Sequence, residues 1–209
     1  MMKIVGVGLN KTGTTTLGVC LRTLGFDHIS FDPAAFRLFR ANDHGAVMRV
    51  VEERDSFEGW PWALLYREID RAYPGSKFIL TARKSPEIWY DSLCRHADRT
   101  GPTEYREGVY GHAMPHDHRA EHIDFYRRYN SLVRAYFVDR PDQLLEVCWE
   151  NGDGWPELSR FLGRPCPALP LPHANKSRHP YVESLARLKQ RAFGRAFRGR
   201  GSKRGADPI

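Results

Sequence analysis

The segment that most constrains the fold lies at the start of the chain, where a short apolar run leads into a loop rich in glycine and threonine. Residues 3–8 (KIVGVG) have the length and the β-branched content of a buried strand. From Thr14 to Leu24 the apolar residues recur at helical spacing, and Gly25 follows as a stop signal. A strand, a polar loop and a helix in this order predict the opening unit of an α/β domain.

The same alternation continues along the chain. Further strands are predicted at 28–31, 77–82 and 143–149, the last of them buried. Helices are predicted at 33–40, 45–54, 60–73, 86–97, 120–138 and 155–162, whereas residues 100–118 show no periodicity. This order predicts a three-layer α/β fold, with a central parallel β-sheet covered by helices on both faces. Ligands of such sheets bind beyond the carboxyl ends of the strands, which is where the loop 8–16 and the residues after Ala82 belong.

The loop itself combines several features that suit an anion. The helix that begins at Thr14 offers unpaired backbone N–H groups and the positive end of its dipole. Gly13 lets the backbone approach a ligand closely, and Lys11 adds a full positive charge. The hydroxyls of Thr14, Thr15 and Thr16 add further donors. The alternative is an ordinary threonine-capped helix after a strand.

The position of the lysine distinguishes this loop from two common phosphate-binding loops. Gly8 and Gly13 have the spacing of the Walker pattern, but Thr14 stands where that pattern has its lysine. Gly6 and Gly8 match the start of the dinucleotide-binding pattern, but Lys11 stands where its third glycine belongs. Both an ATP-dependent enzyme and a nicotinamide enzyme are therefore disfavoured.

A lysine ahead of a Gly-Thr turn resembles the 5′-phosphosulfate loop of the small P-loop sulfotransferases, which use 3′-phosphoadenosine 5′-phosphosulfate (PAPS). The match is direct over Lys11-Thr12-Gly13-Thr14-Thr15. This resemblance implies a P-loop NTPase-like sulfotransferase fold. It also implies that Lys11 stabilises charge on the leaving phosphate and that the 5′-phosphate is held by the loop residues Thr12, Gly13, Thr14, Thr15 and Thr16.

A second segment, KFILTARKSPEIWYDSL, resembles the motif that binds the donor's 3′-phosphate in this family. By this resemblance Arg83 pairs with the 3′-phosphate and Ser92 adds a hydroxyl. Pro86 and Ser92 have the family's spacing, but Arg83 and Ser92 are one residue further apart than is usual. The extra residue, Lys84 or Ser85, leaves open whether Lys84 joins Arg83 at the phosphate.

Transfer to a hydroxyl or an amine needs a base near the acceptor. Three carboxylates are candidates for this role, in the order Glu58, Asp55 and Asp32, and His28 is a fourth candidate. Members of the family use a glutamate or a histidine, at a position that varies. Each of these residues has the alternative role of a solvated or helix-capping side chain.

The irregular region 100–118 and its surroundings contain five histidines, among them His112, His116, His118 and His122. This spacing has one metal interpretation, a zinc site, but no cysteine joins the histidines and the family's chemistry uses no metal. We therefore expect no metal site and interpret the region as a lid over the acceptor. The acceptor is expected to be a small molecule, a glycan or a lipid.

The net charge of +7 suggests nucleic-acid binding, but the position of this charge along the chain argues against it. Eight basic residues and one acidic residue follow position 183, so the tail carries all of the excess and residues 1–183 are neutral. We therefore expect no nucleic-acid partner. The chain divides into a sulfotransferase domain at 1–180 and a basic amphipathic helix with a disordered end at 181–209. That helix either docks on the domain or contacts an anionic membrane surface.

The remaining features lead us to expect a cytoplasmic protein. The four cysteines are far apart and are expected to be free thiols. The first strand begins at Lys3, which leaves no room for a signal peptide, and no apolar run is long enough to span a membrane. The favoured function is PAPS-dependent sulfuryl transfer. Two alternatives stay open, a nucleotide or small-molecule kinase and a non-catalytic nucleotide-binding protein of the same fold.

Overall fold

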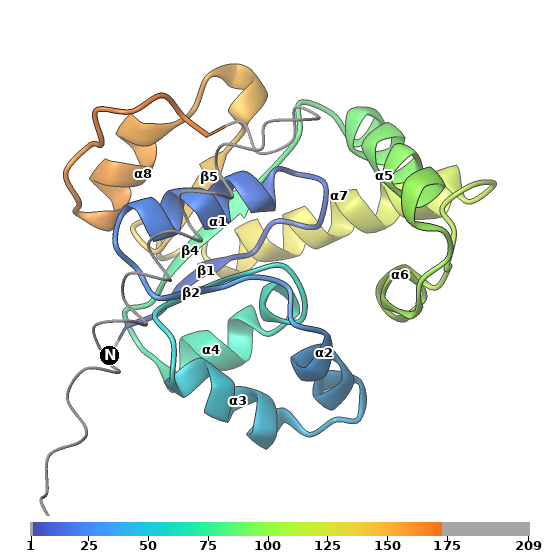
Figure 1. The fold of residues 1–209 in the computed structure, drawn as a ribbon, viewed down its shortest axis with the longest axis horizontal. Helices are drawn as coiled ribbons and strands as arrows, with labels where there is room; N and C mark the ends of the chain where they lie inside the picture. Colours follow the sequence, from blue (N-terminus) through green and yellow to red (C-terminus); the bar gives the residue numbers. More distant parts are fainter. Residues whose placement is uncertain (1, 173–209) are drawn as a thin grey trace, which may run out of the picture. The chain divides into compact units, whose positions relative to one another are not determined.

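The computed structural model describes residues 2–172, which form an α/β domain (Figure 1). The expected basic segment at 181–209 lies outside the described residues. Within residues 2–172, no helix combines the length and the apolar character needed to cross a membrane. The four cysteines form no disulfide, as the sequence predicted.

The centre of the domain is a sheet of five parallel strands in the order β2-β3-β1-β4-β5. Val5 at its middle lies opposite Phe57 on one side and Phe78 on the other. The predicted parallel sheet is therefore confirmed, although the three-residue strand β3 was not predicted. The strands are β1 (Ile4–Gly6), β2 (His28–Ile29), β3 (Ser56–Glu58), β4 (Lys77–Thr81) and β5 (Leu144–Val147).

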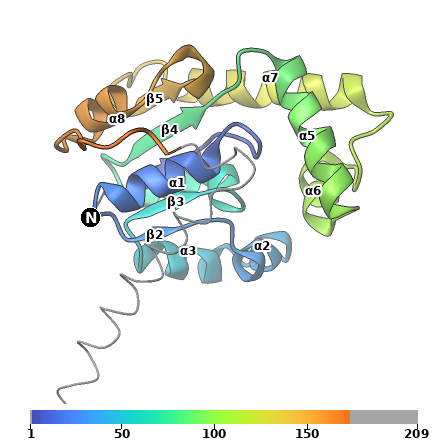
Figure 2. The ribbon, with the colours of Figure 1, turned by 45° about the horizontal axis from the view of Figure 1, so that its top comes forward.

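Helices cover both faces of the sheet, and Figure 2 shows α1 and α8 on one face with α2 and α3 on the other. The helices are α1 (Thr14–Thr23), α2 (Pro33–Arg40), α3 (His44–Glu52), α4 (Tyr66–Ala72), α5 (Pro86–Thr100), α6 (Glu104–Tyr110), α7 (Arg119–Tyr136) and α8 (Trp155–Leu162). Two 3-10 turns, Trp62–Leu64 and Trp149–Asn151, complete the described elements. The three-layer architecture is thus the one that the alternation of strands and helices predicted.

The alternation of side chains along the strands creates two cores. Ile4 and Ile79 face α1 and α8, where they pack with Leu17 and Leu158. The neighbouring strand residues face the opposite layer of α2, α3, α4 and α7. A third core joins α5 and α6 to α7, and in it the rings of Trp89 and Tyr126 stack with centroids 4.7 Å apart. This third core places α5 beyond the carboxyl ends of the strands (Figure 1).

The predicted helix at 60–73 is broken in the structure. Its first part is a turn that contains the cis peptide Trp60-Pro61 and a short 3-10 segment, and α4 begins only at Tyr66. The reason is packing, because Trp60 belongs to the third core whereas Trp62 belongs to the core under the sheet. Residues two apart on a helix point in nearly opposite directions around its axis, so a continuous helix would not place Trp60 and Trp62 in these two cores.

The region 100–118 contains a helix, α6, that the sequence pattern did not predict. Its buried face carries Arg106, which is 2% exposed, in place of an apolar residue. The Arg106 guanidinium donates to the carbonyl of Ala113 at 2.9 Å and to the hydroxyl of Thr100 at 3.1 Å. A helix of seven residues whose core side chain is charged has no apolar periodicity to detect.

A strand does form within 143–149, but the prediction that it would be buried was wrong. Strand β5 is the edge of the sheet and pairs only with β4 in the described residues. Leu144 and Leu145 are half-buried, and Glu146 is exposed. The Glu146 carboxylate pairs with Arg134 of α7 at 2.6 Å.

Candidate active site at the carboxyl ends of the strands

The loop between β1 and α1 has the backbone geometry of an anion cradle. Lys11 and Gly13 both have positive φ, at 69° and 95°. No side chain caps α1 at Gly13, and the first turn of the helix carries no acidic residue. The first backbone N–H groups of α1 are thus left without the side-chain acceptors that usually satisfy them, which suits an anion.

Buried hydrogen bonds hold this loop in place. The hydroxyl of Thr12, a fully buried residue, donates to the Leu9 carbonyl at 2.6 Å and lies 2.6 Å from the hydroxyl of Thr81. The indole of Trp89 donates to the Asn10 carbonyl at 2.9 Å. The Thr12 side chain therefore shapes the loop from inside, whereas Thr15 is exposed at its opening.

Gly13 is required at its position for two reasons. Its φ of 95° is in the left-handed region, which favours glycine. A Cβ at this position would also lie 2.3 Å from Cδ1 of Trp149, whose indole N–H donates to the Gly13 carbonyl at 3.3 Å. The loop is thus held from the β5 side of the site as well.

Lys11 lies in a cluster of positive charge. Its side chain is partly buried, and this burial lowers the pKa of its ammonium group from the ordinary value. Arg99, Arg83 and Arg95 lower the pKa further by repulsion. Burial and the nearby cations Lys11, Arg106 and Arg99 likewise lower the pKa of His96 to about 4, so this imidazole is neutral at pH 7.

The cluster includes two arginines of α5, Arg95 and Arg99, that the sequence analysis missed. Together with His96 and the predicted Ser92 they are spaced i, i+3, i+4 and i+7, so these four residues share one side of the helix. This spacing was visible in the sequence, but nothing local showed that this side of α5 would lie near Lys11. A concentration of cations at the end of a parallel sheet fits a ligand with several negative charges.

Arg83 follows β4 directly, at the same edge of the sheet. Its backbone N–H donates to the hydroxyl of Tyr126 at 2.9 Å, and its guanidinium pairs with the Glu150 carboxylate at 2.8 Å. The backbone N–H of Lys84 donates to the other oxygen of the same carboxylate at 3.0 Å. The Arg83 guanidinium and the Lys84 backbone N–H thus share one carboxylate.

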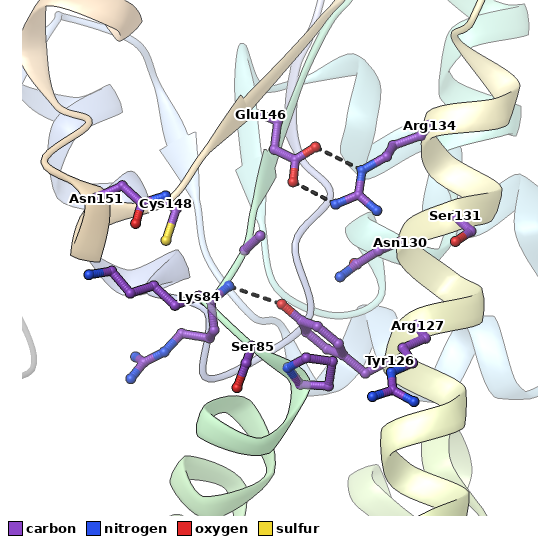
Figure 3. A pocket seen from close by; sticks show the side chains of 13 residues that line it. Lys84, Ser85, Tyr126, Arg127, Asn130, Ser131, Arg134, Glu146, Cys148 and Asn151 are labelled. Atoms are coloured by element: carbon purple, nitrogen blue, oxygen red, sulfur yellow. Dashed lines mark hydrogen bonds and ion pairs between the residues drawn. The ribbon is translucent and has the colours of Figure 1, made fainter.

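A cavity of about 380 Å³ lies between this turn and α7 (Figure 3). Figure 3 shows the paired Arg134 and Glu146 on one side of it and Lys84 with Asn151 on the other. Two buried polar atoms in its lining, Nε of Arg83 and Oδ1 of Asn130, have no hydrogen-bond partner among the described residues. The lining residues are Ala82, Arg83, Lys84, Ser85, Pro86, Tyr126, Arg127, Asn130, Ser131, Arg134, Glu146, Cys148 and Asn151.

Glu58 is the one of the three candidate carboxylates that the structure brings to the loop. It ends β3, the neighbour of β1, and is 5% exposed. Burial raises the pKa of its carboxyl group, and hydrogen bonds from Ser30 and Thr14 lower the pKa in part. A Cβ on Gly18 of α1 would lie 3.1 Å from Glu58 Oε1 and 2.8 Å from His28 Nε2. Burial lowers the pKa of His28 to about 3.

The other two carboxylates lie elsewhere. Asp32 is the N-cap of α2, where its carboxylate accepts from the backbone N–H groups of Ala34 and Ala35 at 2.8 and 3.0 Å. Asp55 precedes β3 and so lies at the amino ends of the strands, away from the loop. Its carboxylate accepts from the Asp27 backbone N–H at 3.2 Å. Both therefore have structural partners, and the geometry favours Glu58.

Three histidines, His112 before α7, His118 at its N-cap and His122 in its first turn, pack with one another. The rings of His112 and His118 stack with centroids 3.5 Å apart, and His122 is buried beside them. In the part of the chain that the structure describes, no three histidine, cysteine or acidic side chains come together in a way that would hold a metal ion.

Comparisons with known proteins agree with this geometry. The family model described as "Sulfotransferase domain" matches residues 3–106 and 99–179. The chain is also 25% identical over 213 residues to "Ava biosynthesis cluster protein M" of Aspergillus versicolor, with 82% of this chain and 80% of that protein covered. The family match spans both the loop at Lys11 and the segment at Arg83. The chain therefore belongs to the sulfotransferase domain family.

Proposed function

We propose that this protein transfers a sulfuryl group from PAPS to a hydroxyl or amine of an acceptor. The observation that carries the proposal is the position of Lys11, in the loop just before a helix that has no side-chain cap and near enough to three arginines for their charges to lower its pKa. PAPS carries negative charge at both its 5′ and its 3′ ends, which this cluster complements.

At the 5′ end, Lys11 and the first N–H groups of α1 are proposed to hold the phosphosulfate. The acceptor oxygen or nitrogen forms a bond to sulfur as the bond from sulfur to the 5′-phosphate oxygen breaks. The electron pair stays on the phosphate, and Lys11 stabilises that charge. Stabilisation by a fixed cation is strongest in a site that is partly shielded from water, as the Lys11 side chain is.

At the 3′ end, Arg83 and Ser92 are proposed to bind the 3′-phosphate, as the family resemblance implies. The structure supports this assignment by adding the Lys84 backbone N–H beside Arg83 and the cations Arg95 and Arg99 farther along α5. Guanidinium groups suit phosphate because they offer paired, planar N–H donors.

Glu58 is the proposed base, which takes the proton that the acceptor loses. The raised pKa of this carboxylate lies closer to neutral pH, which makes Glu58 a better proton acceptor than an ordinary glutamate. Its contact with Thr14 places it at the start of α1, on the β3 side of the loop. The acceptor is proposed to be a small molecule, a glycan or a lipid.

Calorimetry with adenosine 3′,5′-bisphosphate, the product left by PAPS, tests the proposal. We expect saturable binding of the bisphosphate and at least tenfold weaker binding of adenosine 5′-monophosphate, which lacks the 3′-phosphate. ATP with magnesium is the comparison for a kinase. Absence of saturable bisphosphate binding would falsify the proposal, and bisphosphate binding without turnover of PAPS across an acceptor panel would support a non-catalytic protein.

A further inference from the structure

One acidic side chain, Glu150, occupies the two groups that are placed to bind the donor's 3′-phosphate. Its Oε1 lies 2.8 Å from Nη2 of Arg83, and its Oε2 accepts the Lys84 backbone N–H at 3.0 Å. Both carboxylate oxygens are therefore used, each on a different donor. A guanidinium and a backbone N–H ahead of a helix are the donors that a phosphate would also use.

The ion pair is accessible enough to be exchanged. The side chains of Arg83 and Glu150 are 22% and 30% exposed, so the pair is neither locked in the core nor fully in water. A partly exposed carboxylate that leaves its partner regains hydration, which offsets much of the lost attraction. A phosphate dianion carries more charge than a carboxylate and can use the same donors.

The backbone around Glu150 is fixed, so the exchange involves its side chain. Glu150 lies in the 3-10 turn that follows β5. The preceding residue, Trp149, donates its indole N–H to the Gly13 carbonyl at 3.3 Å, and the Cys148 N–H donates to Asp153 at 2.7 Å. The first of these contacts holds the turn against the loop between β1 and α1, and the second fixes the turn internally.

We propose that Glu150 is an internal competitor of the 3′-phosphate, which weakens the hold of the site on the nucleotide and thereby promotes release of the bisphosphate product. This inference rests on the proposed function, because it requires the 3′-phosphate to bind at Arg83. When the nucleotide binds, its 3′-phosphate takes Arg83 and the Lys84 N–H, and the carboxylate turns to solvent. When the product leaves, the carboxylate returns to Arg83.

The test compares Glu150→Gln with the wild-type chain by calorimetry and stopped-flow release. We expect Glu150→Gln to bind adenosine 3′,5′-bisphosphate about 3- to 5-fold more tightly, the upper part of the range for loss of a partly exposed ion pair, mainly through slower release. Adenosine 5′-monophosphate should change by less than about twofold, because it displaces nothing from Arg83. In an Arg83→Ala background the effect of Glu150→Gln should disappear.

Glu146→Gln is the matched control, because it breaks the ion pair of Arg134 beside the same cavity without touching Arg83. It should leave both nucleotides' affinities unchanged. Glu150→Ala is a second variant that should act in the same direction as Glu150→Gln. Weaker or unchanged bisphosphate binding in both Glu150 variants would overturn the inference and assign Glu150 to positioning Arg83. Absence of nucleotide binding by the wild-type chain would instead refute the proposed function.

Discussion

Gly13→Ala tests the geometry of the donor loop most directly, because a second glycine separates the two costs of the substitution. Gly13 and Gly25 have nearly the same φ, 95° and 89°. An added Cβ would lie 2.3 Å from Trp149 at Gly13, whereas nothing lies within 4 Å of it at Gly25. Gly25→Ala thus reports the cost of the left-handed backbone alone.

The magnitudes follow from these two environments. A left-handed backbone costs a non-glycine residue about 1–2 kcal/mol, which is the full expected loss for Gly25→Ala. At Gly13 the indole of Trp149 must also move, which adds about 1–3 kcal/mol for overpacking and for the hydrogen bond to the Gly13 carbonyl. We therefore expect a loss of about 2–5 kcal/mol for Gly13→Ala.

Urea unfolding followed by fluorescence and circular dichroism measures both free energies of unfolding, and calorimetry measures bisphosphate binding. Gly13→Ala should weaken binding at least about tenfold, because displacing Trp149 changes the loop that would hold the 5′-phosphate. Gly25→Ala should bind like the wild-type chain. Equal losses of stability in the two variants would refute the packing argument, and unchanged binding by Gly13→Ala would refute the role of this loop.

The remaining predictions concern the chemistry and the tail. Lys11→Ala should lower kcat by about 10²-fold or more, with little change in melting temperature, because it removes the cation that stabilises the leaving phosphate; near-normal turnover would contradict that role. For Glu58, kcat/KM should fall as the pH drops through its raised pKa, and Glu58→Gln should remove this acidic limb from the residual activity. The pKa of Glu58 is higher in the folded than in the unfolded chain, so the stability of the wild type relative to Glu58→Gln should rise as the pH falls through this range. Urea unfolding at pH 7 and pH 5 measures this difference. The opposite trend would show that the fold stabilises the carboxylate as an anion. If the basic tail binds membranes, anionic liposomes should float the full chain but not a chain that ends at residue 183, and equal flotation would exclude the tail as the contact.

Local patterns in the sequence were sufficient for the framework of the fold. Residues 3–25 predicted the first strand, the loop and α1 because apolar spacing, glycines and threonines act over only a few residues. Helices α2 and α8 begin and end where the sequence predicted, at Pro33–Arg40 and Trp155–Leu162. The position of Lys11 before Gly13 separated this loop from a Walker loop, and the family match agrees with that distinction.

The tertiary structure decided which residues meet at the end of the sheet. Strand β3 has only three residues and no pattern of its own, yet its place beside β1 brings Glu58 to Thr14 and leaves Asp55 at the other edge. Trp89 docks α5 on the loop, and Arg95 and Arg99 of this helix lie near enough to Lys11 to lower its pKa. Contacts such as Trp149 with Gly13, which are 136 residues apart, arise from packing and strand order, which no short segment encodes.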